Sequence, residues 1–142
     1  MPRSNAKQPI ERILDANLNR TKEGLRVCEE FARFILNDAF LTREFKDIRH
    51  RVSAIALKNA GLRACIDKRD TGSDPGTTLH HPGELTRKNA ADIFRANIQR
   101  VKESARVLEE FSKLQSARAA LEFKKIRYRL YVLEQKTVKR LI

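Results

Sequence analysis

Two copies of one set of polar residues stand where amphipathic helices carry their apolar side chains. The set comprises Asn17, Arg20 and Gly24 in one segment, and Asn97, Arg100 and Ser104 in a later one. At 100° per residue, both copies fall inside an apolar arc. Their side chains are therefore expected to point toward the core, or toward a cleft in it where arginine could hold an anion.

Two more arginines, Arg49 and Arg127, also stand among apolar residues. A buried guanidinium without an anionic partner costs several kcal/mol, so each of the four arginines must meet a carboxylate or a bound anion. Either nearby carboxylates pair with them and fix the register of the helices, or the arginines hold phosphate groups through forked hydrogen bonds. The candidate carboxylates, at the edges of the apolar arcs, are Glu23, Glu30, Glu103 and Glu110.

A third group of charged residues lies in the one long loop, among glycines and prolines. Arg69 could act as a charge clamp, and the carboxylates of Asp70 and Asp74 could bind Mg²⁺. Aspartate, glycine, serine and proline also build ordinary turns, so the turn interpretation stays open beside the site.

Composition limits the classes of function. The chain has 142 residues and a formal charge of +12, which favours an anionic partner such as nucleic acid, acidic lipid or a phosphorylated metabolite. No stretch approaches a membrane span or an apolar signal region, so a cytoplasmic protein without membrane contact is expected. Cys28 and Cys65 are expected to be reduced thiols, and adjacent His80 and His81 lack the spacing of a zinc site.

An internal repeat organises the chain. A shift of 80 residues aligns 13–31 with 93–111, and a shift of 78 aligns 45–51 with 123–129. The apolar periodicity predicts helices over 9–36, 40–60, 84–114 and 117–141, with breaks at Asn37 and Asp38 and at Gln115 and Ser116. We therefore expect one all-α domain over 1–142: a four-helix bundle with approximate two-fold symmetry. Its hairpin repeats cover about 9–60 and 84–141, joined by a loop over 61–83. Tandem solenoid repeats are the alternative, but two units are usually too few.

Longer motifs resemble a known family, over about residues 10–134. They comprise Asp15, Ala16, Asn17, Leu18, Asn19, Arg20, Glu23, Gly24, Leu25, Arg26, Val27 and Glu29; Arg69, Asp70, Thr71, Asp74, Gly76 and Thr77; and Ala96, Asn97, Arg100, Glu103, Ala105, Arg106, Val107, Leu108, Glu109 and Glu110. They are similar to the helical hydroxymethylpyrimidine-phosphate kinase family of thiamin biosynthesis, a domain also found fused N-terminal to thiamin-phosphate synthase. The resemblance implies a phosphomethylpyrimidine kinase that uses ATP and Mg²⁺ and gives the pyrophosphate for thiamin phosphate synthesis.

Each candidate residue has a role under this resemblance. Catalysis is expected from Arg20, Arg69 and Arg100, and metal binding from Asp70 and Asp74. Substrate binding is expected from Asn17, Glu23, Arg49, Asn97, Glu103 and Arg127. A phosphate monoester is mostly ionised at pH 7, so such a site needs positive charge against repulsion rather than a strong base.

Two other functions remain open, and so do the partners. The charge alone would suit a basic nucleic-acid-binding module, although inward arginines argue against it. A non-catalytic helical domain that docks thiamin-phosphate synthase is the second alternative. The expected partners are a small phosphorylated pyrimidine, ATP, thiamin-phosphate synthase, and a second copy of the chain in a dimer.

Overall fold

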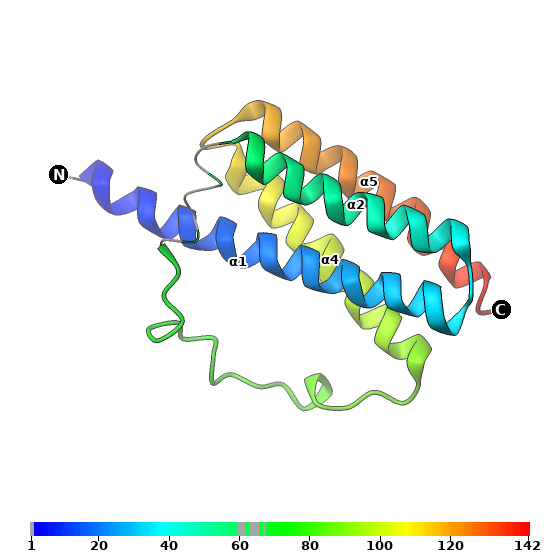
Figure 1. Cartoon of the computed structure of the whole chain (residues 1–142). Coiled ribbons are helices and arrows are strands. Elements are labelled where there is room, and N and C mark those ends of the chain that lie inside the picture. The colour runs from blue at the N-terminus through cyan, green and yellow to red at the C-terminus, as the bar shows by residue number, and fades with distance from the viewer. Residues whose placement is uncertain (1, 60–61, 63–65, 67) are drawn as a thin grey trace.

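The computed structural model describes residues 2–59, 62, 66 and 68–142, with side chains from Lys7 onward. Within these residues it contains helices and no strand, which confirms the all-α expectation. The elements are α1 (Pro2–Glu30), the π-helical turn η1 (Phe31–Ile35), α2 (Ala39–Lys58), the 3₁₀ turn η3 (Pro82–Glu84), α4 (Ala90–Ser112) and α5 (Ala117–Lys139). Figure 1 shows α1 and α4 crossing, with α2 and α5 side by side and the loop running apart from the helices.

The helix ends follow local backbone chemistry. Asn37 adopts a left-handed φ of 50°, which asparagine tolerates better than most residues. Asp38 then caps α2 by accepting a hydrogen bond from the Leu41 amide at 2.9 Å. Ser116 caps α5 in the same way, so both predicted hairpin breaks are confirmed. In the second half of the chain, α4 begins six residues later than predicted because Asn89, not a residue near Glu84, is its N-cap.

Two other predicted boundaries differ or lie outside the described residues. The first helix begins at Pro2 and contains Pro9, whereas the sequence predicted a start at Pro9. It ends in a π turn, in which the Leu36 amide donates to the Phe31 carbonyl at 3.1 Å. The predicted end of the second helix at Ala60 and loop start at Gly61 lie outside the described residues, as does Cys65.

A single apolar core holds the four helices together. Phe94 of α4 stacks on Phe31 at 5.2 Å between ring centroids and meets Phe45 of α2 edge-on at 6.1 Å. Such aromatic pairs add about 0.5–1.5 kcal/mol each beyond the apolar area that they bury. Cys28 is also in this core, and its burial raises the pKa of the thiol, so it stays protonated. No helix in the described part of the chain is long and apolar enough to cross a membrane.

The two halves meet at a close crossing of α1 and α4. The Thr21 hydroxyl lies 2.6 Å from that of Ser104, and a Cβ built on Gly24 would lie 2.5 Å from Val101 Cγ2. The 80-residue repeat converts each of these contacts into the other, since Thr21 corresponds to Val101 and Gly24 to Ser104. The approximate two-fold axis therefore passes through this crossing, and on its other side between α2 and α5.

We expect Gly24→Ala to destabilise the fold by about 1–3 kcal/mol, because the added methyl overlaps Val101 where two helix backbones approach. This cost exceeds the gain of about 1 kcal/mol that alanine offers over glycine within a helix. Urea unfolding measures the change. Adding Val101→Ala should make Gly24→Ala less costly in the double-mutant cycle. If Gly24→Ala alone were as stable as the parent, the close crossing would be wrong.

Candidate functional site

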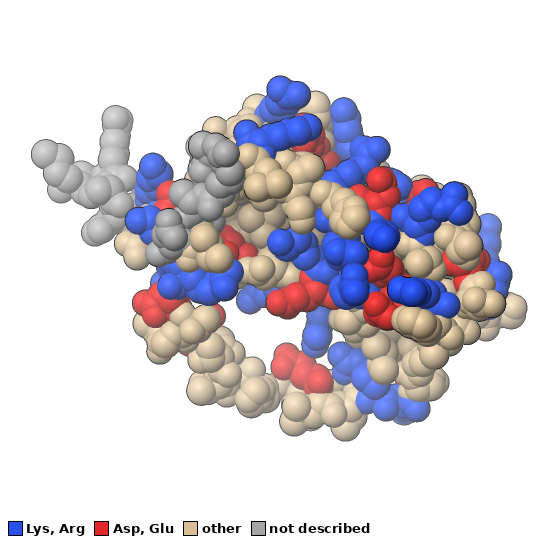
Figure 2. Space-filling model, in the orientation of Figure 1, with Lys and Arg blue, Asp and Glu red and all other residues tan. Residues whose placement is uncertain are grey.

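Two adjoining cavities lie on one side of the α1–α4 crossing. The first, the axis cavity, has a volume of about 540 Å³ between α1 and α4. The second, the loop cavity, has about 630 Å³ between α1 and the loop. Both are lined by Asn17, Arg20 and Glu23, so they form one continuous depression. Figure 2 shows the opening between the loop and the helices, with charged atoms around it.

The repeated residues line the axis cavity in pairs. The cavity lining includes both copies of each residue: Asn17 and Asn97, Arg20 and Arg100, Glu23 and Glu103, Gly24 and Ser104. The two copies face the same space because α1 and α4 are related by the approximate axis. The structure therefore brings together six of the residues predicted from the sequence for catalysis or substrate binding.

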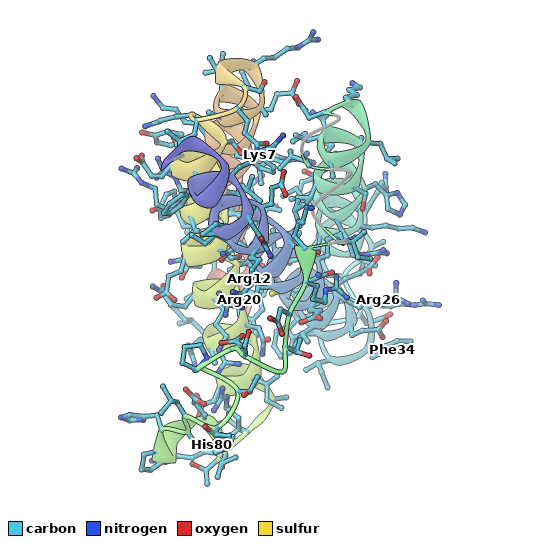
Figure 3. All side chains as sticks on the ribbon, turned by 90° about the vertical axis from the view of Figure 1, so that its left-hand side faces the viewer. Lys7, Arg12, Arg20, Arg26, Phe34 and His80 are labelled. Atoms are coloured by element: carbon cyan, nitrogen blue, oxygen red, sulfur yellow. The ribbon has the colours of Figure 1, made fainter. Side chains whose placement is uncertain are left out.

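The sequence predicted that Arg20 and Arg100 point toward the core or toward a cleft in it, and the structure places them at a cleft. Both residues are exposed, and both line the axis cavity. Figure 3 shows Arg12 and Arg20 on the side of α1 that faces the loop, where both line the loop cavity, whereas Arg26 lies on another side of the helix. Among the ion pairs and hydrogen bonds of the described residues, neither Arg20 nor Arg100 has a partner. The axis cavity thus contains two guanidinium groups without a partner, beside the carboxylates of Glu23, Glu84 and Glu103.

The other two inward arginines are neutralised by carboxylates. Arg127 Nε donates to Glu109 Oε2 at 3.0 Å, and Arg49 Nη2 donates to Glu29 Oε2 at 3.2 Å. The hydrogen bond from Arg127 to Glu109 is the main cause of a raised Arg127 pKa. Neither arginine lines the axis cavity or the loop cavity, so the structure does not place Arg49 and Arg127 with the other candidate residues.

For Arg49 and Arg127 the alternative of pairing with carboxylates therefore holds, but the candidate carboxylates named from the sequence are not the partners. The partners are Glu29 and Glu109, and the candidates Glu30 and Glu110 lie one residue later. A step of one residue turns a helix by about 100°, enough to exchange a buried position for an exposed one. The repeat could have revealed the correct partners, because Glu29 recurs as Glu109 while Arg49 recurs as Arg127.

A forked ion pair ties the loop to α1. Arg69 donates from Nε to Asp15 Oδ2 at 2.7 Å and from Nη2 to Asp15 Oδ1 at 2.9 Å. The hydrogen bonding by Asp15 raises the Arg69 pKa. Arg12 Nη2 donates to the Asp70 carbonyl at 3.1 Å, on the same side of the cavity. Sequence reasoning did not assign a role to Asp15 or Arg12, since nothing in the periodicity links α1 to residues more than fifty positions away.

Asp70 and Asp74 line the loop cavity and also form turns. Asp70 accepts hydrogen bonds from the Ser73 hydroxyl and amide, and these lower the pKa of Asp70. Asp74 Oδ1 accepts from the Gly76 amide at 2.8 Å. In the described residues, no group of three or more acidic, histidine or cysteine side chains is arranged to hold a metal. Two carboxylates beside a cavity lined by arginine nevertheless suit Mg²⁺ by ligand type, because Mg²⁺ usually takes one or two carboxylates with phosphate oxygens and water.

The two asparagines have the same geometry in both halves. Asn17 Nδ2 donates to the Ile13 carbonyl and Asn97 Nδ2 to the Ile93 carbonyl, each at 2.8 Å. These bonds hold each side chain against its own helix. In the hydrogen bonds of the described chain, neither amide oxygen has a donor. Each can therefore accept a hydrogen bond from a donor group on a ligand in the cavity.

Comparison with known proteins adds the biological context. A model of the ThiD2 family matches residues 12–136. Proteins named thiamine-phosphate synthase are 45% identical over 128 residues in Thermosynechococcus vestitus, 45% over 132 in Nostoc punctiforme and 41% over 122 in Rhodopirellula baltica. These alignments cover 90%, 93% and 86% of this chain but only 35%, 36% and 32% of the relatives. No solved structure matches the chain.

These relatives correct one expectation and support another. Their name denotes a different enzyme from phosphomethylpyrimidine kinase, so the expectation that this chain is that kinase is contradicted. Involvement in thiamin biosynthesis is supported by the same relatives. The chain spans about a third of their length, so it corresponds to one part of them. With a match that extends over most of its residues, the chain belongs to the ThiD2 family.

Proposed function

We propose that this domain binds a phosphorylated pyrimidine of thiamin biosynthesis in the axis cavity and the adjoining loop cavity. The observation that carries the proposal is the pair Arg20 and Arg100, two guanidinium groups that line one cavity without a carboxylate partner in the described chain. Most other arginines with described side chains do pair, for example Arg106 with Glu110. Unpaired arginines in a concave site suit the forked hydrogen bonds of a phosphate group.

The dimensions of the site favour a small molecule over a polymer. Volumes of about 540 and 630 Å³ lie within the usual range for small-molecule sites. A nucleic-acid surface would instead require a row of cations that follows a phosphate backbone. The amide oxygens of Asn17 and Asn97 would accept hydrogen bonds from amino groups on the ring, while Glu23 and Glu103 would contact other donors of the ligand.

ATP and Mg²⁺ remain proposals as additional ligands. Asp70 and Asp74 would hold the metal beside the phosphate, and its charge would offset repulsion between phosphate groups. Arg69 would remain on Asp15 or turn toward the ligand. In the longer relatives, the remaining two thirds of the polypeptide would use the bound pyrimidine, so thiamine-phosphate synthase is the proposed partner of this domain. A dimer of the chain also remains a prediction.

A thermal-shift titration tests the proposal. Hydroxymethylpyrimidine phosphate should raise the melting temperature, with a stabilisation of about 2.7 kcal/mol at one hundred times Kd. The matched control is unphosphorylated hydroxymethylpyrimidine, which should stabilise the protein much less because it lacks the anion. ATP and Mg²⁺ are added separately and together, and ATP turnover is measured in the same samples. If the phosphate ester has no effect while duplex DNA binds with a steep salt dependence, the nucleic-acid function would replace this proposal.

A further inference from the structure

A third cavity lies where the approximate two-fold axis passes between α2 and α5. This α2–α5 cavity has a volume of about 310 Å³ and is separate from the site proposed above. Its charged lining residues are Arg51, Lys58, Glu122, Lys125 and Arg129, and its apolar wall is formed by Ala54, Ile55 and Ile126. Four cations therefore meet one carboxylate around a space of small-molecule size.

The first hairpin supplies carboxylates that fix one of these cations. Arg129 donates to Asp47 Oδ2 and to Glu44 Oε2, each at 2.7 Å. Arg51 Nε donates to the same Asp47 oxygen at 3.0 Å. The hydrogen bond from Arg129 is the main cause of a lowered Asp47 pKa, so this carboxylate is charged at neutral pH. Arg129 is thus held in place by two carboxylates, whereas Arg51 shares one of them.

The second hairpin returns only one of these two carboxylates. The 78-residue repeat aligns Arg51 with Arg129 and Glu44 with Glu122, but it aligns Asp47 with Lys125. If the halves were alike, a carboxylate at position 125 would face Arg51 as Asp47 faces Arg129. A lysine occupies that position instead, so the second half adds a positive charge where the first has a negative one. The difference between the halves leaves the cavity with an excess of positive charge.

The remaining carboxylate does not cancel this excess. Glu122 lines the cavity as well, and its Oε1 lies 3.6 Å from Arg118 Nε, so this one carboxylate stands against Arg51, Lys58 and Lys125. Lys58 and Lys125 make no ion pair or side-chain hydrogen bond with the residues that the structure describes. Like charges gathered in one depression repel each other, and a bound anion relieves that repulsion. Ala54, Ile55 and Ile126 form a wall that offers no competing polar group on that side of the cavity.

We propose that the α2–α5 cavity is a second anion site, which takes a small phosphate-bearing ligand through Lys58, Lys125 and Arg51. Arg129 stays on its two carboxylates and forms the rigid side of the site. A volume of about 310 Å³ suits inorganic phosphate or a compact phosphate ester. A phosphate-bearing lipid headgroup presents the same chemistry, so the test separates the two sources.

The test uses the full chain with Arg20→Ala and Arg100→Ala, which removes the cations of the axis cavity. Calorimetric titration with inorganic phosphate should still show binding, and NMR of the lysine side chains should show shifts at Lys58 and Lys125. Introducing Lys125→Asp restores the carboxylate of the first hairpin and should weaken phosphate binding at least about tenfold. Lys58→Gln, which keeps the length and polarity of the side chain, should weaken binding in the same direction.

Lys124→Asp is the matched control, because it makes the same charge change one residue away and outside the cavity lining. It should leave phosphate binding nearly unchanged. Equal weakening by Lys124→Asp and Lys125→Asp would show only a general effect of net charge, and the proposed site would be wrong. Absence of binding in the Arg20 and Arg100 variant would also overturn it. Preference for vesicles of anionic phospholipid that phosphate does not compete away would replace the small ligand by a membrane headgroup.

The outcome is independent of the function proposed for the axis cavity. That proposal fails if hydroxymethylpyrimidine phosphate does not stabilise the parent protein. The second site fails if phosphate does not shift Lys58 and Lys125 in the variant background. The two results are measured with different ligands on different residues, so each can fail alone.

Discussion

Replacing both Arg20 and Arg100 by alanine is expected to abolish the stabilisation of the domain by hydroxymethylpyrimidine phosphate. Hydrogen bonds to charged groups contribute about 1.5–3 kcal/mol each, so a single substitution should weaken binding by about 10–100-fold. Because both side chains are exposed and unpaired in the described chain, the melting temperature without ligand should change little. Calorimetric titration gives the affinity, and thermal unfolding without ligand checks the fold.

Arg26→Ala and Arg106→Ala provide matched controls for this prediction. They are also repeat-related arginines on α1 and α4, but they pair with Glu30 and Glu110 and do not line the axis cavity. Their loss should leave ligand affinity nearly unchanged. If all four single variants bind equally well, the cavity arginines do not hold the phosphate. Arg20→Lys should bind the ligand more tightly than Arg20→Ala and less tightly than the parent. The lysine ammonium keeps the positive charge but cannot donate the two parallel hydrogen bonds of a guanidinium.

Replacing Glu109 by glutamine should reduce the free energy of unfolding by about 3–5 kcal/mol, because it leaves the Arg127 guanidinium buried without a countercharge. Counted over the whole residue, Glu109 is 4% exposed and Arg127 is 8% exposed, so water cannot replace the lost partner. Glutamine has nearly the same shape, so the change in charge, not a cavity, causes the loss. Urea unfolding followed by circular dichroism measures it.

The repeat and the exposed neighbour supply the controls for the Glu109 prediction. Glu29→Gln should cost less, because the side chain of its partner Arg49 is 21% exposed against 10% for Arg127. Glu110→Gln, on the exposed face of α4, should change stability by less than about 1 kcal/mol. Replacing Glu109 by leucine and Arg127 by methionine together should restore much of the stability. An equal loss in all three glutamine variants would contradict the buried pair.

The helices could be predicted from the sequence because their apolar residues recur with the helical period over twenty or more positions. The hairpin turns could also be predicted, since Asp38 and Ser116 are good N-caps and Asn37 tolerates a left-handed backbone. The start of α4 was predicted at Glu84, which is too early. Asn89 is the N-cap and accepts a hydrogen bond from the Asp92 amide at 2.8 Å, and asparagine is as good an N-cap residue as Asp38 or Ser116, so the sequence carried this signal too.

The sequence predicted which residues belong to the site, but it did not predict how their side chains are arranged. The repeat singled out Arg20 and Arg100, and a helical wheel placed them inside the apolar arc. Whether that position is core or cavity depends on where the neighbouring helix crosses, which Gly24 and Ser104 determine by letting α1 and α4 approach closely. The ion pair between Arg69 and Asp15 lies beyond periodicity altogether, because it joins a helix to a loop through tertiary contact alone.

Where the two halves cross, Gly24 packs against the larger Val101, and the hydroxyl of Thr21 meets that of Ser104. Two copies of the first hairpin would put Gly24 against Thr21 twice and lose the hydroxyl pair of Thr21 and Ser104, and two copies of the second would press Ser104 against Val101. Each hairpin therefore packs better against the other hairpin than against a second copy of itself. Fragments cut within the loop should reassemble as mixed pairs, and the covalent link guarantees the one-to-one ratio that this preference demands.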